Sequence, residues 1–146
     1  MSQHEKALSG HWEHFSHRAD MGIRGVGQSV GEAFIQAALA LTATITDPSG
    51  IRCEHSAIQI ECEAADLDTL LFDWLNALVY EMAVRNMLFG RFQVHLRNRH
   101  LQARAWGEPV DRIRHQPAVE VKGATYTELR VAKERETWVA QCVIDV

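Results

Sequence analysis

The sequence has few cysteines and few prolines, and it contains no long run of apolar residues. Its three cysteines, Cys53, Cys62 and Cys142, form neither a Cys-x-x-Cys pair nor zinc-finger spacing, so they predict no disulfide framework and no thiolate metal site. No segment approaches the roughly 18 apolar residues of a transmembrane helix. The polar N-terminus lacks the apolar stretch of a signal peptide. We therefore expect a cytoplasmic protein without a membrane partner.

The sequence signatures of several common enzyme classes are missing as well. There is no Gly-rich phosphate loop, no Gly-x-Ser-x-Gly elbow and no His-Glu-x-x-His helix. The histidines at positions 4, 11, 14 and 17 suggest a zinc or nickel site, but on a strand His11 and His17 share a face that His14 does not. We expect neither an assembled catalytic site nor a histidine metal site.

The composition is that of one ordinary globular domain. Apolar residues make up 47% of the 146 residues and charged residues 23%, far from the composition of a disordered chain. A chain of this length buries about two thirds of the surface of its unfolded form, which predicts one core. We expect a flexible N-terminal tail, residues 1–11, followed by a single domain, residues 12–146.

Capping residues and periodicity predict the secondary structure. Ser29 and Glu32 form a capping box before an apolar helical stripe, and Asp66 caps a second helix with a broad apolar face. Period-two alternation predicts strands at residues 11–24, 58–63, 89–97, 101–105, 119–122, 126–133 and 138–146. A hairpin turn is expected at residues 98–99 and a polar loop from residue 107 onward. The predicted class is α+β, with two helices packed on largely antiparallel β-sheet.

Charge is distributed unevenly along the chain, although the net charge is only -4. Residues 1–84 carry twelve acidic and four basic residues, whereas residues 85–115 carry seven arginines and two acidic residues. Arg97, Arg99 and Arg104 could contact phosphates or an acidic patch on a protein partner. They could also be the solvated face of antiparallel strands. Aromatic residues do not interleave with them as in platforms for single-stranded nucleic acid.

Acidic groups stand near both ends of the predicted domain. If the first and last strands are neighbours, Asp20 faces Asp145 and the terminal carboxylate of Val146, and three such oxygen groups would form a site for a hard cation. Crowded anions raise each other's pKa unless a cation is near, and Lys122, on a half-buried predicted strand, is a candidate. An acid at a strand end is also commonly just solvated. His17 is expected to be a hydrogen-bonded structural residue or to support Asp20.

Several motifs, in order along the chain, resemble those of the archease family. They are Ser16 to Asp20, Glu32-Ala33-Phe34, Leu70-Leu71-Phe72-Asp73-Trp74-Leu75, Gly107-Glu108, Val121 to Tyr126, and Asp145-Val146. The match runs from about residue 12 to the last residue. The sequence departs from the family pattern at Ser16 and Arg18, where archeases have aspartate and threonine, and at residues 123–124 and 127.

The resemblance implies an archease-like fold and a protein cofactor that is not itself an enzyme. Archeases assist the GTP-dependent RNA ligase of the RtcB type, which joins RNA ends in tRNA splicing and RNA repair, by promoting its metal-dependent guanylylation and repeated turnover. RNA would then be an indirect partner. By this resemblance Asp20, Asp145 and Val146 are metal ligands and Lys122 is needed for activity. Such oxygen ligands suit Ca²⁺, with Mg²⁺ or Mn²⁺ as alternatives.

Two other functions remain open on the sequence alone. A chaperone-like adaptor would bind its partners through the arginine segment and would not depend on a metal. A small metal-dependent phosphohydrolase would turn over a phosphoester by itself, but no general base stands beside the acidic residues.

Overall fold

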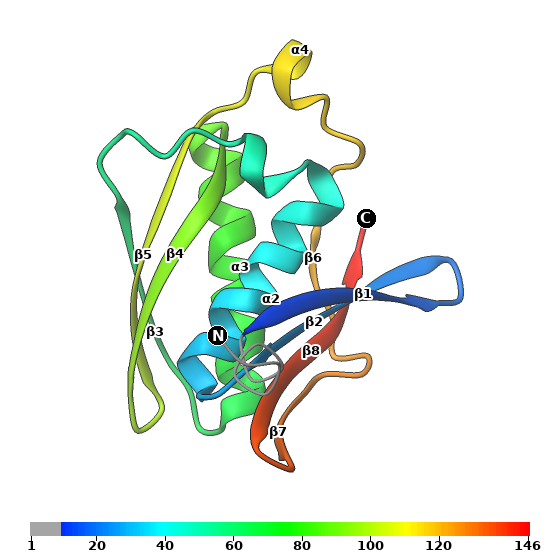
Figure 1. Cartoon of the computed structure of the whole chain (residues 1–146), viewed down its shortest axis with the longest axis vertical. Coiled ribbons are helices and arrows are strands. Elements are labelled where there is room, and N and C mark those ends of the chain that lie inside the picture. The colour runs from blue at the N-terminus through cyan, green and yellow to red at the C-terminus, as the bar shows by residue number, and fades with distance from the viewer. Residues whose placement is uncertain (1–9) are drawn as a thin grey trace, which may run out of the picture.

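Two antiparallel sheets enclose two long helices in the computed structural model, which describes residues 10–146 (Figure 1). Both helices contact strands of both sheets, so the core lies between the sheets. This confirms the predicted α+β class with two long helices on antiparallel sheet. Residues 1–9 of the expected tail lie outside the described part of the chain, and the first strand begins at His11.

Local capping sets the start of each long helix. Helix α2 spans Val30–Ile45, and the Ser29 side chain accepts a hydrogen bond from the Glu32 amide at 3.1 Å. Helix α3 spans Leu67–Arg85, and its Asp66 cap accepts from the Thr69 amide at 2.8 Å. Both predicted caps are therefore confirmed. No helix among the described residues is long and apolar enough to cross a membrane.

The larger sheet has five strands and carries both ends of the described chain. Its order is β1 (His11–His17), β2 (Asp20–Gly27), β8 (Thr137–Asp145) and β6 (Gly123–Ala124), and β7 (Arg130–Glu134) also pairs with β8. The prediction of one strand over residues 11–24 is wrong, because the chain reverses at residues 18 and 19. At this turn Arg18 adopts a φ of 54°.

The smaller sheet has the order β3 (Ile58–Glu63), β5 (His100–Pro109) and β4 (Met87–Arg97). The turn between β4 and β5 falls at residues 98–99, as predicted. Residues 107–109 were expected to open a polar loop, but they continue β5, and Gly107 packs so closely on β4 that a Cβ would stand 1.8 Å from the Leu88 carbonyl oxygen. Only glycine fits there.

The connection from β5 back to the larger sheet contains one short helix. Helix α4 spans Arg112–His115, and a 3₁₀ turn, η1, spans Pro48–Gly50 after α2. The predicted strand at residues 119–122 is wrong, because this segment has no regular structure and the chain joins the sheet only at β6.

Aromatic and aliphatic side chains fill the space between the sheets. Trp74 of α3 is fully buried, and its indole N–H donates to the Phe34 carbonyl of α2 at 3.1 Å, which ties the two helices together. Helix α2 crosses β2 at Gly25, where a Cβ would stand 2.2 Å from the Ala33 carbonyl oxygen and from the Ala37 amide nitrogen. The helix packs directly on the strand because this position has no side chain.

Candidate functional site

The β1–β2 hairpin brings Asp20 to the end of β8. In the β2–β8 pair Met21 lies opposite Ile144, so the next step of the antiparallel register places Asp20 opposite Asp145. The two segments are more than a hundred residues apart in sequence but share one end of the sheet. The predicted acidic site depends on a strand carrying Asp20 that neighbours the last strand, and in the described fold this neighbour of β8 is β2, while β1 pairs only with β2.

Strand β6 brings Lys122 to the same end of the sheet. Gly123 pairs with Asp145, and the Lys122 amide donates to the Asp145 carbonyl at 2.7 Å. The Ala124 amide donates to the Asn76 side chain of α3 at 3.0 Å, which fixes β6 against the helix. The expectation of a half-buried lysine on a strand is wrong, because Lys122 is exposed and precedes the strand.

The side chains of this cluster face solvent. Asp20, Lys122 and Asp145 are exposed, and Val146 is 38% exposed. Within the described residues, no ion pair of 4.0 Å or less involves Asp20, Lys122 or Asp145. The backbone therefore places the charged groups at one end of the sheet, while their side chains stay free to turn toward a ligand.

His17 lies opposite Asp20 in the β1–β2 pair. Its side chain is half-buried, and its buried Nδ1 atom has no hydrogen-bond partner within the described structure. No hydrogen bond joins His17 to Asp20 there, so a supporting role for this histidine stays a prediction.

The donor set of the cluster suits a hard divalent cation. Asp20 and Asp145 supply carboxylate oxygens, the ligands that Ca²⁺, Mg²⁺ and Mn²⁺ prefer. In residues 10–146 no group of three or more His, Cys, Asp or Glu side chains could hold a metal ion. A third protein ligand would thus come from a group other than these side chains, as the predicted Val146 carboxylate does. The residues fit such a cation in chemistry and in their position on the sheet.

The arginines predicted to bind a partner lie on the other sheet. Arg97 ends β4, Arg99 is in the β4–β5 turn and Arg104 is on β5, and all three are exposed. The structure therefore divides the predicted functional residues into two groups, an acidic one on the five-stranded sheet and a basic one on the three-stranded sheet.

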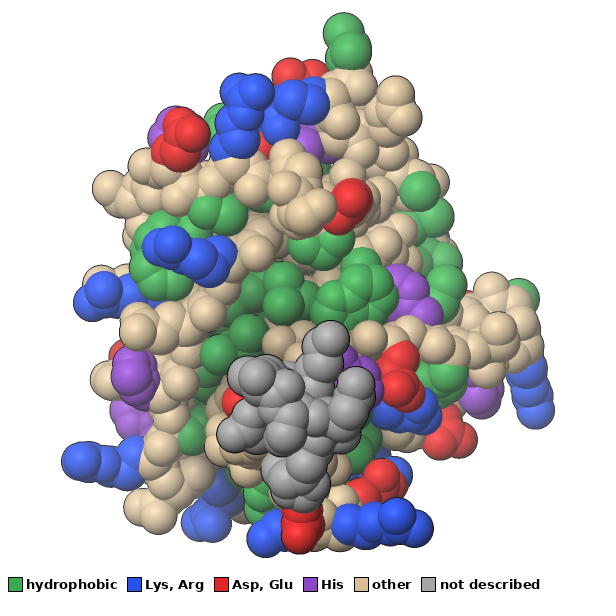
Figure 2. All heavy atoms as spheres, in the orientation of Figure 1, with side chains coloured by type: hydrophobic (Ala, Val, Ile, Leu, Met, Phe, Trp, Pro, Cys, Tyr) green, Lys and Arg blue, Asp and Glu red, His purple; other side chains and the backbone are tan. Residues whose placement is uncertain are grey.

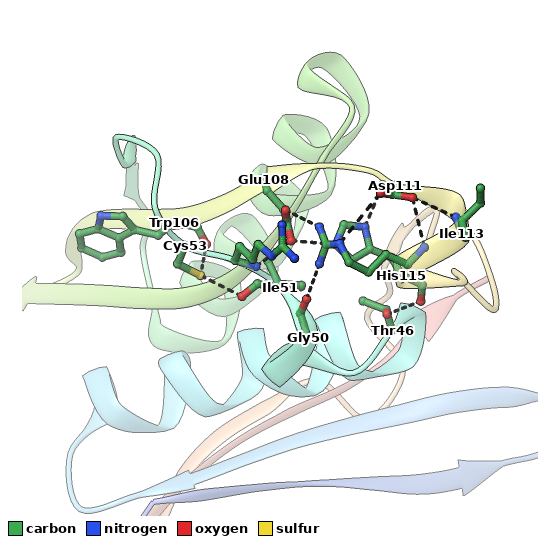
Figure 3. A network of polar contacts seen from close by, with 11 residues as sticks. Thr46, Gly50, Ile51, Cys53, Trp106, Glu108, Asp111, Ile113 and His115 are labelled. Atoms are coloured by element: carbon green, nitrogen blue, oxygen red, sulfur yellow. Dashed lines mark hydrogen bonds and ion pairs between the residues drawn. The ribbon is translucent and has the colours of Figure 1, made fainter.

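A polar network that the sequence did not indicate lies beside helix α4 (Figure 3). Glu108, at the buried end of β5, receives hydrogen bonds from the Arg114 guanidinium and from the Arg52 amide, the latter at 2.7 Å. Arg114 bonds Oε1, whereas the Arg52 amide bonds Oε2, and Nε2 of the buried His115 stands 2.9 Å from the same Oε2. The Arg114 guanidinium, with help from the Arg52 amide and His115, lowers the pKa of Glu108 to about 2 against the opposing effect of burial.

This network fixes the connection that leads to Lys122. Thr46, just after α2, donates to the His115 carbonyl at 2.6 Å, and the Ala118 amide donates to the Ile45 carbonyl at 2.8 Å. The segment between β5 and β6 is therefore tied to the end of α2 by hydrogen bonds to buried groups. Gly107-Glu108 is one of the archease-like motifs, but the sequence did not indicate the partners of Glu108.

The cysteines are placed as structural residues. Cys142 is fully buried in β8, and burial raises the pKa of its thiol to about 12. Burial likewise raises the pKa of Cys62 to about 11. Because the thiolate is the reactive form, neither side chain is suited to nucleophilic chemistry near neutral pH.

Comparisons with known proteins agree on one family. A sequence profile of the Archease protein family matches residues 12–146. The chain is 37% identical over 140 residues to the protein archease of Pyrococcus furiosus, covering 92% of this chain and 98% of that protein. It is 32% identical over 137 residues to the protein archease of Sulfurisphaera tokodaii, with the same coverage.

Solved structures show the same fold. The solution structure of Methanobacterium thermoautotrophicum protein 1598 superposes with a TM-score of 0.75 at 26% identity, covering 92% of this chain and 98% of that one. The crystal structure of an archease from Thermotoga maritima, described as a possible chaperone, superposes with a TM-score of 0.62 at 16% identity, covering 90% of this chain and 94% of that one.

Proposed function

The chain belongs to the archease family, and from this membership we propose that it is a non-enzymatic cofactor protein of a GTP-dependent RNA ligase of the RtcB type. It acts in the cytoplasm and promotes guanylylation and repeated turnover of the ligase, in tRNA splicing or RNA repair. The ligase is its direct partner, and RNA takes part through the ligase.

The convergence of Asp20, Lys122 and the end of β8 supports this proposal most directly. The β2–β8 register, continued by one step, places Asp20 opposite Asp145, and the Lys122 amide is bonded to Asp145. Two exposed carboxylates and an exposed ammonium group at one end of a sheet suit a ligand that combines a cation with phosphate. Such a ligand is present in the nucleotide site of an enzyme that uses GTP.

Each residue of the cluster has a distinct role in the proposal. Asp20, Asp145 and the carboxylate of Val146 bind a divalent cation, Ca²⁺ foremost and Mg²⁺ or Mn²⁺ otherwise. Such a cation supplies positive charge where negative charge develops on a transferred phosphoryl group. Lys122 orients a phosphate or carboxylate of the partner, and His17 holds the hairpin strand that carries Asp20.

The test measures guanylylation and RNA joining by the partner ligase with limiting amounts of this protein. Asp20→Asn and Asp145→Asn should each lower the multiple-turnover rate by on the order of tenfold or more, because each removes one carboxylate from the site. Lys122→Gln should also lower it. Glu136→Gln is the matched control, since this exposed residue in the β7–β8 turn is in the same sheet but at its other end.

Full stimulation by both aspartate variants would remove the acidic cluster from the mechanism. An adaptor that acts through its arginines predicts that result, together with loss of stimulation in an Arg97→Glu/Arg104→Glu variant. The two functions are therefore separated by the same assay.

A further inference from the structure

The outward face of the three-stranded sheet is left uncovered by the fold. The helices lie on only one side of β3, β5 and β4 (Figure 1). Along β4 the residues on the other side are Arg91, Gln93, His95 and Arg97, all exposed. Figure 2 shows Lys/Arg and His side chains projecting from this edge of the molecule, on the left of the view.

The arginines of this face form no close ion pair within the described structure, although the charge of Arg99 acts on the Asp66 carboxylate. Arg24, Arg85, Arg114 and Arg130 form ion pairs with glutamates. By contrast, within the described residues, no ion pair of 4.0 Å or less involves the four arginines of the β4–β5 hairpin, which are Arg91, Arg97, Arg99 and Arg104. Their positive charges are available to an external anion.

The basic groups form a line along β4 because they share one face of this strand, and Arg91 is also held by an aromatic ring. The Arg91 guanidinium lies 4.2 Å from the ring centroid of Trp106, which fixes it over the indole ring. Arg91 and Arg97 lie six residues apart on one strand face, so the strand rise places them about 20 Å apart. Arg99 extends the line into the turn. This spacing suits the repeated charge of a polymer rather than one small anion.

The middle of the face offers hydrogen-bonding groups. The register places Gln59, Arg104 and Gln93 side by side across the three strands, and Glu61, Gln102 and His95 in the next row. These side chains line a shallow hollow of about 600 Å³. Amide and imidazole groups can both donate to and accept from the edges of unpaired bases, and the guanidinium of Arg104 can donate to them.

We propose that this face binds single-stranded RNA without a platform of stacking aromatic residues, with the phosphate backbone along the β4 arginines and the bases hydrogen-bonded to the Gln and His rows. The positive charges and their spacing indicate that the ligand is a phosphodiester polymer. The choice of RNA over DNA rests on the proposed function. The substrate strand would thereby contact this protein as well as the ligase.

The distribution of charge across the three-stranded sheet favours single-stranded RNA over an RNA duplex. Arg91 and Arg97 stand on the β4 side, whereas Glu61 and Glu63 stand on the β3 side, and Glu61 is 2.6 Å from His100 of β5. A duplex presents two phosphate backbones, and the acidic side would repel the second of them. An acidic peptide would satisfy the arginines but would leave the rows of base-reading side chains without a role.

The test measures fluorescence anisotropy of labelled 12-nucleotide RNA and DNA strands of mixed sequence with the isolated protein. In an Arg91→Gln/Arg97→Gln variant, which removes both arginines of the β4 line, we expect the affinity for RNA to fall on the order of tenfold or more at low salt. Loss of two phosphate contacts should also make the slope of log affinity against log salt shallower by about 1.4.

The matched control is Arg112→Gln/Arg135→Gln. It removes the same charge from exposed arginines in α4 and in the β7–β8 turn, and it should bind RNA as the unmodified protein does. Equal losses in the two double variants would overturn the proposal, because binding would then follow net charge alone. Absence of RNA binding, or stronger binding of an RNA duplex or of a poly-glutamate peptide, would also overturn it.

The experiment separates this proposal from the proposed function. Asp20→Asn and Asp145→Asn, which should lower stimulation of the ligase, lie on the other sheet and should leave RNA affinity unchanged. Equal affinity for RNA and DNA would retain the binding face but would contradict its assignment to RNA. An arginine double variant that loses RNA binding but still stimulates the ligase fully would refute a substrate role for the face. The role proposed for the acidic cluster would be unaffected by that result.

Discussion

The carboxylate of Glu108 joins three segments that would otherwise meet only through apolar contacts. It is 7% exposed, and its partners come from the loop after η1 and from helix α4. A buried charge of this kind is stable only because every neighbour donates to it. The contacts stabilise the segment that carries Lys122 to the end of the larger sheet.

Glu108→Gln should lower the free energy of unfolding by about 2 kcal/mol, because the amide keeps the shape but loses the charge-assisted bonds to Arg114 and the Arg52 amide. Chemical denaturation at pH 7 measures the change. Glu134→Gln, which alters an exposed glutamate paired with Arg130, should cost less than about 0.5 kcal/mol. Equal effects of the two substitutions would show that the Glu108 network is not stabilising.

The stability difference between the unmodified protein and Glu108→Gln should depend on pH. The pKa of Glu108 is about 2 in the folded protein, below its ordinary value of 4.5. Its contribution is therefore fully present above about pH 4.5 and is lost as the pH falls from there toward 2. The two denaturation curves should converge over this window, and a constant difference down to pH 2.5 would contradict the network.

The sequence could not have revealed this network. Glu108 is followed by Pro109, a pattern that predicts a turn, and its Arg52 partner is 56 residues away. The strand continues to residue 109 because residues 107–109 pair with residues 87–89 of β4, where Gly107 packs closely on Leu88, and these contacts arise from the fold.

At the scale of elements, helix α2 depends on the glycine of the strand beneath it. Gly25→Ala should lower the free energy of unfolding by about 1–3 kcal/mol, because the added methyl meets backbone atoms of α2 that cannot move independently. Thermal denaturation measures this. Gly50→Ala is the control, since nothing lies within 4 Å of its added Cβ, and it should be nearly neutral. A neutral Gly25→Ala would mean that α2 can shift away from β2 at little cost.

Elements set by local chemistry were predictable, and those set by packing were not. The caps at Ser29 and Asp66 are side-chain contacts to nearby amides, so the sequence predicts both helix starts. The β1–β2 turn was missed because it uses Arg18 in a left-handed conformation, without the glycine or asparagine that usually marks such a position. Residues 119–122 alternate like a strand, but they form no strand in the described structure, and their bond to β8 is the one from the Lys122 amide to the Asp145 carbonyl.

At the scale of the whole molecule, the fold places the two predicted groups of functional residues on different sheets. The acidic cluster is at one end of the five-stranded sheet, and the arginines are on the outer face of the three-stranded sheet. The sequence predicted both sets of residues. It also predicted that Asp20 and Asp145 meet if the strands that carry them are neighbours. It could not supply the register, because strand pairing over more than a hundred residues depends on the packing of both strands against α2.

The proposed cation site predicts that Ca²⁺ stabilises the folded protein. A ligand at a hundred times its dissociation constant adds about 2.7 kcal/mol, which for a domain of this size raises Tm by about 5–10 °C. Calorimetry of the EDTA-treated protein with and without Ca²⁺ measures the shift, and Mg²⁺ and Mn²⁺ in parallel identify the preferred ion. The double variant Asp20→Asn/Asp145→Asn should abolish the shift, because it removes both side-chain carboxylates of the proposed site.

A two-residue Gly-Ser extension after Val146 tests the third proposed ligand in the same measurement. It moves the terminal carboxylate away from Asp145 without changing any residue of the sheet, so it should reduce the Ca²⁺-induced shift in Tm while leaving the Tm in EDTA unchanged. Glu136→Gln should keep the full shift, because it lies at the far end of β8. An equal Ca²⁺ shift in the double aspartate variant would place the ion elsewhere on the molecule, and Asp20 and Asp145 would then be solvated strand ends.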